Sequence, residues 1–283
     1  MKLAITFDRL RWEEKALSDA AEAAGLEASL VDVKALVFEI PKKRPEFGDV
    51  VLQRCISHYR SSLLTKTLEG AGLNVINSFA VAETCSNKLA TSIALSNAKV
   101  PTPRTFLALS SEAAEEAAEK LGYPFVMKPF TGSWGRMVTV VRDRATFQSL
   151  IEFKEELANP QEQHMYYLQE YVRRPPRDIR AIVAGDTIVA CVHRVAPKGE
   201  WRTNVARGAV SKAFKPDSEL KEIILSAAEA VGGGILGVDA MEPDSGYLVH
   251  EVNNTVEFKG AQSAVDVDIP AQLVKYVAQS ARR

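Results

Sequence analysis

The 283-residue sequence has little of what disulfide-rich, zinc-binding or redox-active proteins depend on. It contains three cysteines, Cys55, Cys85 and Cys191, which are widely spaced and form no CxxC pair. An odd number of cysteines without such a pair argues against both a disulfide framework and a zinc site. We therefore expect the three thiols to be small core residues.

A charge imbalance and extended apolar stretches are also missing. The 35 Lys and Arg against 36 Asp and Glu leave a net charge of −1, so there is no global signal for nucleic acid. No apolar run approaches the ~18 residues of a membrane span. The run at residues 2–7 is broken by Asp8 and Arg9 too early for a signal peptide. These absences predict a cytoplasmic protein with no membrane and no nucleic acid among its partners.

The residues of nucleophilic hydrolysis are not arranged for catalysis. The histidines His58, His164, His193 and His250 show no metal-ligand spacing, and we expect them to be structural or surface residues. There is no GxSxG motif and no persuasive Ser/His/Asp order. Hydrolysis through a protein nucleophile therefore has no support.

The sequence does contain a regular alternation of strand and helix patterns. In the first third, strand patterns at 2–7, 28–33, 49–53 and 74–76 are separated by helical patterns at 12–24 and 61–69. This alternation favours a parallel sheet. Asn77 or Ser78 can cap a further helical region, which carries Lys88 and runs to about Asn97. The prolines of VPTPRT then end it.

The rest of the chain divides into two α/β units. In the first we expect strands at 105–109, 125–128, 137–141 and 166–172, with helices at 112–120 and 145–157. In the second we expect a hairpin of strands 179–183 and 187–193, a helix at 217–231, a hairpin ending in 248–259 and a helix at 269–281. The predicted domains are 1–86, 87–172 and 173–283.

Oxygen-bearing side chains gather near the end of the chain. The stretch LVHEVNNTVEFK places Glu251, Asn253 and Glu257 among apolar neighbours, and Asp239 follows small residues just upstream. Magnesium takes oxygen ligands and is usually held by one or two carboxylates plus substrate phosphates. The pattern therefore indicates a magnesium–phosphate site, or else a β-hairpin with Asp239 and Glu251 on a solvated face.

A glycine loop, TGSWGR at 131–136, lies between two expected strands. Walker A and dinucleotide-binding loops lead from a strand into a helix, so this loop is neither. Glycine permits close backbone approach, and Ser133 with neighbouring amides can donate to phosphate oxygens. The loop is thus a mobile flap or an ordinary hairpin turn. Lys128 directly precedes it and Lys88 lies 40 residues earlier; most single lysines are simply solvated.

Two further segments can face a nucleotide. QEYV, residues 169–172, ends a strand and runs into an irregular linker, which can offer adenine an edge of backbone donors and acceptors. The alternative is an edge strand meeting a charged loop. Downstream, RTNVARG adds Arg202, Asn204 and Arg207 to Arg194. Arginine forks suit carboxylate and phosphate oxygens, although many such clusters are surface decoration.

Taken in order, these motifs resemble the ATP-grasp carboxylate–amine ligases, and in particular their RimK-like branch. Within that branch the chain is most similar to ligases that join α-aminoadipate to a small acidic amino-group carrier protein in lysine biosynthesis. The similarity covers nearly the whole chain, including VVLQRCISHYR, GSWGR, PPRDIR, NVARG and NNTVEFK. It implies an α/β ATP-grasp fold of three subdomains, with ATP between the second and third.

The resemblance also implies a role for individual residues. Lys88 and Lys128 would bind the ATP phosphates, and Arg194, Arg207 and Lys128 would be catalytic by neutralising the acyl phosphate. The other implied ATP contacts are the flap Gly132, Ser133, Trp134, Gly135 and Arg136, the adenine edge Gln169, Glu170, Tyr171 and Val172, the ribose neighbour Asp178, and the phosphate-end residues Arg202, Thr203 and Asn204. Asp239, Glu251 and Asn253 would hold magnesium, with two ions expected. Arg194, Asn204, Arg207, Asn254 and Thr255 would bind substrate.

The chain departs from the family pattern in its substrate-reading tail. Lysine-type members resemble N-x-T-M-E-F-K-N and glutamate-using members resemble N-D-V-P-E-F-K-G-F, whereas this chain has NNTVEFKGA. Thr255 matches the first pattern and Gly260 the second, and we predict α-aminoadipate over glutamate, with dual use open. Smaller departures are Cys85-Ser86-Asn87-Lys88 in place of CGDK and Arg207-Gly208-Ala209 in place of RGG.

The implied reaction first forms an acyl phosphate and releases ADP. It then forms an isopeptide bond. A glutamate ligase acting on another acceptor, such as a ribosomal-protein tail or a folate-like or flavin-like cofactor, is the alternative within enzymes. A nucleotide-binding scaffold without catalysis is the alternative outside them. The resemblance further suggests a dimer or tetramer.

Overall fold

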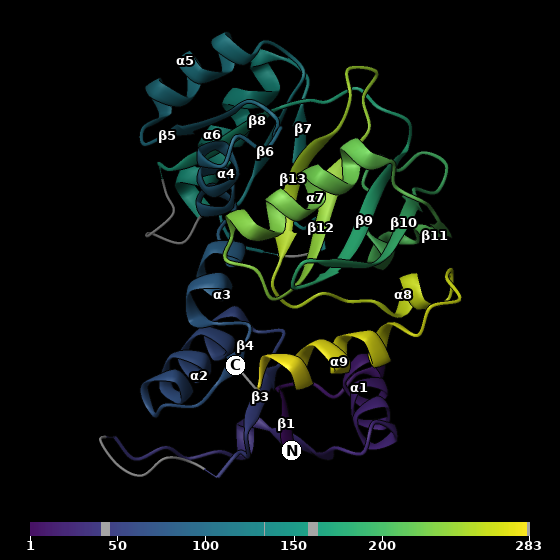
Figure 1. The fold of residues 1–283 in the computed structure, drawn as a ribbon. Coiled ribbons are helices and arrows are strands. Elements are labelled where there is room, and N and C mark those ends of the chain that lie inside the picture. The colour runs from purple at the N-terminus through teal and green to yellow at the C-terminus, as the bar shows by residue number, and fades with distance from the viewer. Residues whose placement is uncertain (41–45, 133, 158–163, 282–283) are drawn as a thin grey trace.

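The computed structural model describes residues 1–40, 46–132, 134–157 and 164–281. Within these ranges the strands form three separate sheets, one from each successive part of the chain (Figure 1). The N-terminus and the last described residues lie near each other beside the first sheet. No described helix is long and apolar enough to cross a membrane.

The first sheet is parallel, as the alternation of patterns predicts. Its order is β2-β1-β3-β4, and every pair within it is parallel. The elements are β1 (Lys2–Phe7), α1 (Trp12–Ala23), β2 (Glu27–Asp32), η1 (Val33–Ala35), β3 (Val50–Gln53), α2 (His58–Gly70) and β4 (Val75–Ile76). Each helix covers the sheet on its way to the next strand, which is how a parallel sheet is connected.

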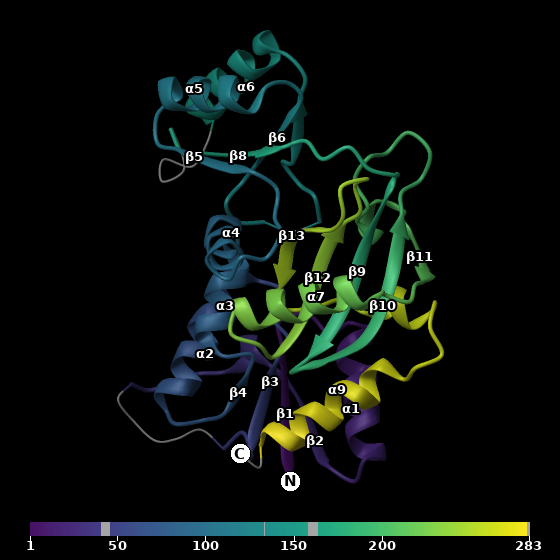
Figure 2. The same cartoon turned by 45° about the horizontal axis from the view of Figure 1, so that its top comes forward.

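The second sheet is antiparallel, with order β5-β8-β6-β7. Helices α5 and α6 cover one face of it (Figure 2). The elements are β5 (Thr105–Ala108), α5 (Ser111–Leu121), β6 (Phe125–Lys128), β7 (Thr139–Val141), α6 (Arg144–Leu157) and β8 (Tyr166–Glu170). The strand expected to begin at Met137 begins at Thr139, so the loop after β6 is longer than predicted.

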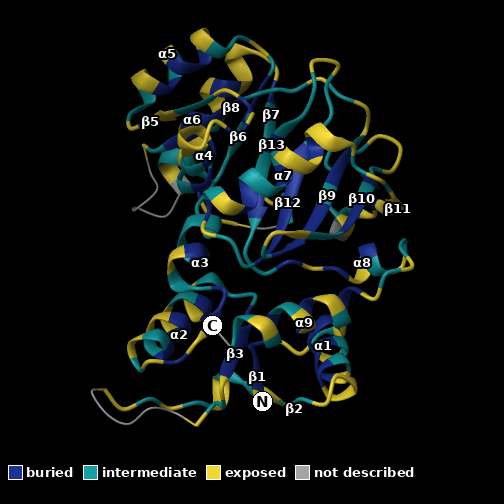
Figure 3. Cartoon of the chain, in the orientation of Figure 1, coloured by how far each residue is buried: buried dark blue, intermediate teal, exposed yellow. Residues whose placement is uncertain are grey.

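The third sheet carries most of the residues that matter for function. Its order is β11-β10-β9-β12-β13, and its central strands are almost wholly buried (Figure 3). The elements are β9 (Arg177–Ala184), β10 (Thr187–Val195), η2 (Val205–Arg207), β11 (Val210–Ala213), α7 (Ser218–Ala230), β12 (Ile235–Met241), β13 (Leu248–Asn253), α8 (Lys259–Gln262) and α9 (Ile269–Ser280). β11 was not expected from the sequence.

The helical region expected from residue 77 to residue 97 is two helices. α3 (Phe79–Ser86) and α4 (Lys88–Asn97) meet at Asn87, whose backbone is extended at φ −112° and ψ 115°. The Asn87 side chain accepts from the amides of Leu89 and Ala90 and so caps α4. The break makes Lys88 the first residue of α4, and its amide donates to the carbonyl of Phe130 over 2.8 Å. Lys88 is thereby fixed beside the glycine loop.

The first and last parts of the chain share one core. α9 packs against α1 and also against the third sheet, and one buried cluster contains Leu3 and Leu17 together with Ile182, Val192 and Leu273. The opposite face of the third sheet packs on α7 and on the region of α3 and α4. The two ends of the chain therefore share one core, and a second buried cluster, which includes Leu64 and Val75, lies within the first part alone.

Asn77 ties the first part of the chain to the third sheet. Its amide exchanges two 2.7 Å hydrogen bonds with the backbone of Ile235, at the start of β12. The same nitrogen donates to the side chain of Asn254 over 2.8 Å and to its carbonyl over 3.0 Å. Asn77 is only 5% exposed, so these are buried bonds that hold a strand and a loop together.

The three cysteines are free thiols, as expected. Cys55 and Cys191 are buried, while Cys85 is half-buried beside α4. Burial raises the pKa of each thiol to about 12, so all three are protonated at neutral pH.

The contacts of Asn77 predict that alanine destabilises the protein far more at Gly234 than at the adjacent Gly233. Both have positive φ, +75° at Gly233 and +110° at Gly234, but a Cβ on Gly234 would lie 2.1 Å from Asn77 Oδ1 whereas one on Gly233 would meet nothing within 4 Å. Gly234→Ala should lower the free energy of unfolding by roughly 2–4 kcal/mol more than Gly233→Ala, because it displaces a buried, hydrogen-bonded amide. Thermal unfolding of the two variants measures this. Equal losses of Tm would contradict the role of Asn77.

Candidate active site

Two cavities adjoin each other at the third sheet. The smaller, of about 360 Å³, lies between the second and third sheets, and the larger, of about 1140 Å³, lies between the third sheet and the first part of the chain. They meet at residues that line both: Lys88, Gly132, Trp134, Arg136, Arg194, Asn204 and Glu251. A group bound in one cavity can therefore reach a group bound in the other.

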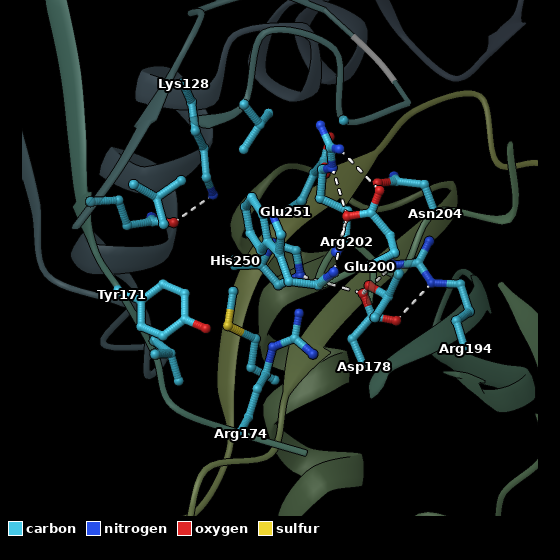
Figure 4. A pocket seen from close by; sticks show the side chains of 18 of the residues that line it. Lys128, Tyr171, Arg174, Asp178, Arg194, Glu200, Arg202, Asn204, His250 and Glu251 are labelled. Atoms are coloured by element: carbon cyan, nitrogen blue, oxygen red, sulfur yellow. Dashed lines mark hydrogen bonds and ion pairs between the residues drawn. The ribbon is translucent and has the colours of Figure 1, made fainter. Parts of the chain in front are cut away.

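A row of buried charges crosses four neighbouring strands beside the cavities. In the strand register Arg194 on β10 faces Asp178 on β9, Arg180 on β9 faces Asp239 on β12, and Asp239 faces Glu251 on β13. Arg194 binds Asp178 through two bonds of 2.8 and 2.6 Å and reaches Asp239 at 3.1 Å. Arg180 also binds both oxygens of Asp239. The sheet thus aligns alternating charges beside the cavities, and Figure 4 shows one pair of the row, Arg194 with Asp178.

The pairing keeps the buried carboxylates ionised. Burial by itself would raise the pKa of Asp178, but Arg194 and His250 outweigh it and hold that pKa far below its usual value. Burial likewise opposes ionisation of Asp239, whose pKa is nevertheless lowered by Arg180 and Arg194. The same attraction raises the pKa of Arg194 despite its burial. Removing any one member would leave an uncompensated charge in the interior.

The expected metal ligands lie together on β12 and β13. Asp239 faces Glu251 directly, and Asn253 Nδ2 lies 3.3 Å from Asp239 Oδ2. Two carboxylates and an amide are oxygen donors of the kind that Mg²⁺ prefers, with phosphates completing its shell. Within the described ranges no three His, Cys, Asp or Glu side chains cluster to hold a metal by themselves. The residues therefore fit a cation that also binds phosphate, and their role as ligands stays a prediction.

Both expected phosphate-binding lysines point into the smaller cavity. Lys128 Nζ donates to Gln169 Oε1 over 2.5 Å, and burial lowers the pKa of Lys128 to about 8. Lys88 Nζ donates to the carbonyl of Gly132 over 2.8 Å and lies 3.9 Å from Glu251 Oε1. Gln169 is itself held by the hydroxyl of Tyr167, which its Nε2 meets at 3.0 Å. Neither lysine is a solvated surface residue.

The glycine loop packs on the arginine-rich segment 202–207. Arg207 Nη2 donates to the carbonyl of Gly135 over 3.3 Å, and a Cβ on Gly135 would lie 2.6 Å from Asn204 Oδ1. The Arg136 guanidinium stacks on Trp134 at 4.9 Å. Ser133 lies outside the described residues. The loop therefore covers both cavities, which fits a flap rather than an ordinary turn.

The segment before Arg207 is held by internal pairs. Arg202 binds Glu200 through bonds of 3.0 and 2.9 Å, and this lowers the pKa of Glu200 to about 2. The Thr203 hydroxyl donates to Asp178, which joins the segment to the buried charge row. Trp201 lies 6.5 Å from Tyr171, ring centroid to centroid, across the smaller cavity.

The structure brings nearly all of the sequence-predicted residues together. The smaller cavity is lined by Lys88, Lys128, Gly132, Trp134, Gly135, Arg136, Gln169, Glu170, Tyr171, Val172, Asp178, Arg194, Arg202, Thr203, Asn204 and Glu251. The larger is additionally lined by Asn253, Asn254 and Thr255. Asp239 lies beneath the arginines at 1% exposure, and Arg207 reaches the flap from outside.

Sequence reasoning missed several lining residues. Arg180 lies two residues after Asp178 on the same strand, so the alternation of side chains would have indicated a shared face. Arg174, Glu200 and Trp201 lie in irregular segments, where no periodicity could have found them. His250, expected to be a structural or surface residue, lines the smaller cavity.

Known proteins resemble the whole chain. Residues 85–277 match the family model of the RimK-like ATP-grasp domain, and residues 3–84 match the LysX preATP-grasp domain. A glutamate–LysW ligase, ArgX, of Sulfolobus acidocaldarius is 36% identical over 278 residues, covering 98% of both chains. An α-aminoadipate–LysW ligase, LysX, of Saccharolobus solfataricus is 36% identical over 271 residues, covering 95% of this chain and 98% of its own.

Solved structures agree on the fold. The RimK domain ATP-grasp protein of Sphaerobacter thermophilus superposes with a TM-score of 0.81 at 25% identity, over 98% of this chain and 99% of that one. The ATP complex of D-alanine–D-alanine ligase from Bacillus anthracis has a TM-score of 0.72 at 16% identity, over 100% of this chain and 98% of its own. The fold is thus that of the ATP-grasp ligases.

The chain belongs to the RimK-like ATP-grasp family, with a LysX-type domain before the ATP-grasp part. It is an ATP-dependent ligase, and its fold implies the use of ATP and a divalent metal. The expectations for family, fold and enzyme class are confirmed. The domain boundaries and the roles of single residues stay predictions.

The lowered pKa of Lys128 predicts how nucleotide binding depends on pH. Below about 8 the ammonium is protonated and attracts phosphate; as pH rises through that value the charge is lost, so ATP affinity should fall. Above that pH the affinity for ATP should fall by at most about tenfold per pH unit. Titration of ATP binding from pH 6.5 to 9.5 measures it, with Lys128→Arg flattening the profile and Lys120→Arg, on the exposed face of α5, leaving it unchanged. An affinity that is constant across this range would contradict the assignment.

Proposed function

We propose that this ligase joins the α-amine of α-aminoadipate to the side-chain carboxylate of the C-terminal glutamate of a small acidic amino-group carrier protein, in lysine biosynthesis. ATP drives the reaction and magnesium, as two ions, assists it. One observation carries the proposal: the two adjoining cavities share a junction lined by the cationic Lys88, Arg136 and Arg194 and by Glu251, which is one of the predicted metal ligands. ATP occupies the smaller cavity and the two substrates occupy the larger.

The chemistry needs a leaving group, because carboxylate and amine do not condense in water unaided. A carboxylate oxygen of the carrier attacks the γ-phosphorus of ATP, the bond to the β-phosphate oxygen breaks, and ADP leaves. The amine nitrogen then attacks the acyl carbon of the acyl phosphate, inorganic phosphate leaves, and the nitrogen gives up a proton. No protein nucleophile is required.

The protein contributes position and charge to these steps. Lys88 and Lys128 hold the phosphate oxygens, while Arg194 and Arg207 offset the charge that develops on the transferred group. Asp239, Glu251 and Asn253 would hold the magnesium, which offsets negative charge on the phosphates when bound. Positioned charges of this kind account for most of the catalysis in phosphoryl transfer.

The charge of the larger cavity suits acidic substrates. Its lining includes six lysines and arginines, Arg11, Lys88, Arg136, Arg180, Arg194 and Lys259, against three glutamates, Glu13, Glu251 and Glu257. A dicarboxylic amino acid and the acidic end of a carrier would both be attracted to it. This supports an acidic carrier over a neutral or basic acceptor.

Glutamate is the second candidate for the amino acid. Thr255 favours α-aminoadipate and Gly260 matches the glutamate pattern, while relatives named for each substrate are equally identical to this chain at 36%. A glutamate ligase on another acceptor has weaker support, since a probable α-L-glutamate ligase of Methanococcoides burtonii is 28% identical.

Glu251→Gln should abolish turnover without unfolding the protein. The substitution removes one carboxylate from the metal set, and we expect kcat to fall by at least about 100-fold, as when other charge-stabilising groups are removed. The matched control is Glu242→Gln, which alters a carboxylate paired with Arg177 outside both cavities. ADP release is measured for both variants. Near-normal release from Glu251→Gln would refute the metal assignment.

The choice of amino acid is tested by ADP release from the purified enzyme with an acidic carrier protein. We expect a larger kcat/KM for α-aminoadipate than for glutamate, and no release when the carrier lacks its terminal glutamate. A larger value for glutamate would replace the first candidate by the second. ADP release that does not depend on the carrier would refute the acceptor.

A further inference from the structure

The loop at residues 254–259, which follows β13, has one side in the core and the other in the larger cavity. Val256 and Phe258 are both 0% exposed and belong to the core cluster that the two ends of the chain share. Thr255 and Glu257, which alternate with them, line the larger cavity. The course of this loop therefore decides which side chains a molecule in that cavity meets.

Three consecutive residues at the start of α1 contact three consecutive residues of the loop in the same order. The contacts are Arg11 Nη1 to Glu257 Oε1 at 3.0 Å, the Trp12 ring to the Phe258 ring at 5.8 Å between centroids, and the Lys259 amide to Glu13 Oε1 at 3.2 Å. Because the two segments lie side by side in register, the first turn of α1 fixes the course of the loop.

A buried charge pair holds the same loop from the core. Arg54 is 2% exposed, and its Nη2 donates to the carbonyl of Val256 over 2.9 Å while its Nε donates to Glu14 over 3.3 Å. Glu14 is 0% exposed and also accepts from Nε and Nη2 of Arg11, over 3.1 and 2.6 Å. Burial by itself would raise the pKa of Glu14, but Arg11 and Arg54 outweigh it and lower that pKa. The buried carboxylate therefore stays charged and keeps both arginines in place.

Arg11 bridges two carboxylates, and the second one depends on it. Its Nε and Nη2 bind Glu14 and its Nη1 binds Glu257, so each of its side-chain nitrogens already donates within the protein. Within the described ranges, Arg11 is the only hydrogen-bond or ion-pair partner of the Glu257 side chain, which is 43% exposed. Although Arg11 lines the larger cavity, it acts on that cavity through Glu257.

We propose that Arg11 is a positioning residue for the amino-acid substrate: by bridging Glu14 and Glu257 it holds the 254–259 loop in the shape that binds this substrate. This rests on the proposed function, in which the amino acid occupies the larger cavity. α-Aminoadipate and glutamate differ by one methylene, which a pocket distinguishes only through its shape. A loop held at both of its faces has such a shape before the substrate arrives, so less freedom is lost on binding.

The first test compares wild type with Arg11→Lys in full-length enzyme, by ADP release with the carrier protein and either amino acid. Lysine keeps a charge beside Glu14 but lacks the fork that spans two carboxylates. We expect KM for the preferred amino acid to rise about tenfold, because the freed loop must be ordered on binding. Any preference between the two amino acids should narrow. The Kd for ATP should not change, since Arg11 does not line the smaller cavity.

The matched control is Arg177→Lys. Arg177 binds Glu242 through Nε and Nη2, over 3.0 and 2.8 Å, much as Arg11 binds Glu14, but it lines neither cavity. This variant should keep the wild-type KM for both amino acids. A rise equal to that of Arg11→Lys would mean that the loss of any such arginine fork weakens substrate binding, and would contradict the specific role of Arg11.

A double variant separates positioning from direct contact with the substrate. If Arg11 acts through Glu257, Glu257→Gln raises the same KM by a similar factor, and Arg11→Lys added to it causes no further rise. The Glu257 side chain is partly exposed, so its replacement leaves the fold intact. Amide hydrogen exchange in residues 254–259 should be faster than in wild type in both single variants.

Three results would overturn the proposal: an unchanged KM for the amino acid in Arg11→Lys, effects on KM that multiply in the double variant, or a Kd for ATP that rises by the same factor as that KM. If wild type releases ADP with neither amino acid, the proposed function is refuted instead. Hydrogen exchange then still shows whether Arg11 holds the loop, so the two failures are distinguishable.

Discussion

The structure depends on the pairing of four charged side chains on one face of the third sheet: Arg194, Asp178, Arg180 and Asp239. Charges this deeply buried are tolerated only when each has an opposite partner in good geometry. Their pairing fixes the relative register of β9, β10 and β12. Because Thr203 binds Asp178 and Glu251 faces Asp239, the same register also fixes the segment that meets the glycine loop and the strand that carries two of the predicted metal ligands.

The site is assembled from parts that are distant in the sequence. The smaller cavity needs Lys88 at the start of α4, Lys128 at the end of β6, and residues of four strands in the third sheet. The larger cavity needs residues from α1 and α2 as well. α9 returns to pack beside α1, so the two ends of the chain are held by a common core. The walls of both cavities therefore form only when distant parts of the chain pack together.

The sequence was informative where a local rule decides the outcome. Strand–helix alternation predicted the parallel sheet, and the spacing of Asp239, Glu251 and Asn253 predicted side chains that lie together. The sequence did not predict those elements whose structure depends on contacts with other residues rather than on a local pattern. β11 is short, and its side chains are mostly exposed, so it has no apolar pattern to read. Asn87 breaks a helix by capping the next one, and the bulge at His250 reverses the alternation on which strand prediction relies.

Asn77 makes the first part of the chain a component of the larger cavity's wall rather than a module beside it. One amide connects β4 to both the strand of Asp239 and the loop of Asn254, and it leaves room only for glycine at position 234. A change at position 77, at position 234 or in the loop of Asn254 therefore acts on one shared set of four hydrogen bonds, so these three places are constrained together although they lie far apart in the sequence.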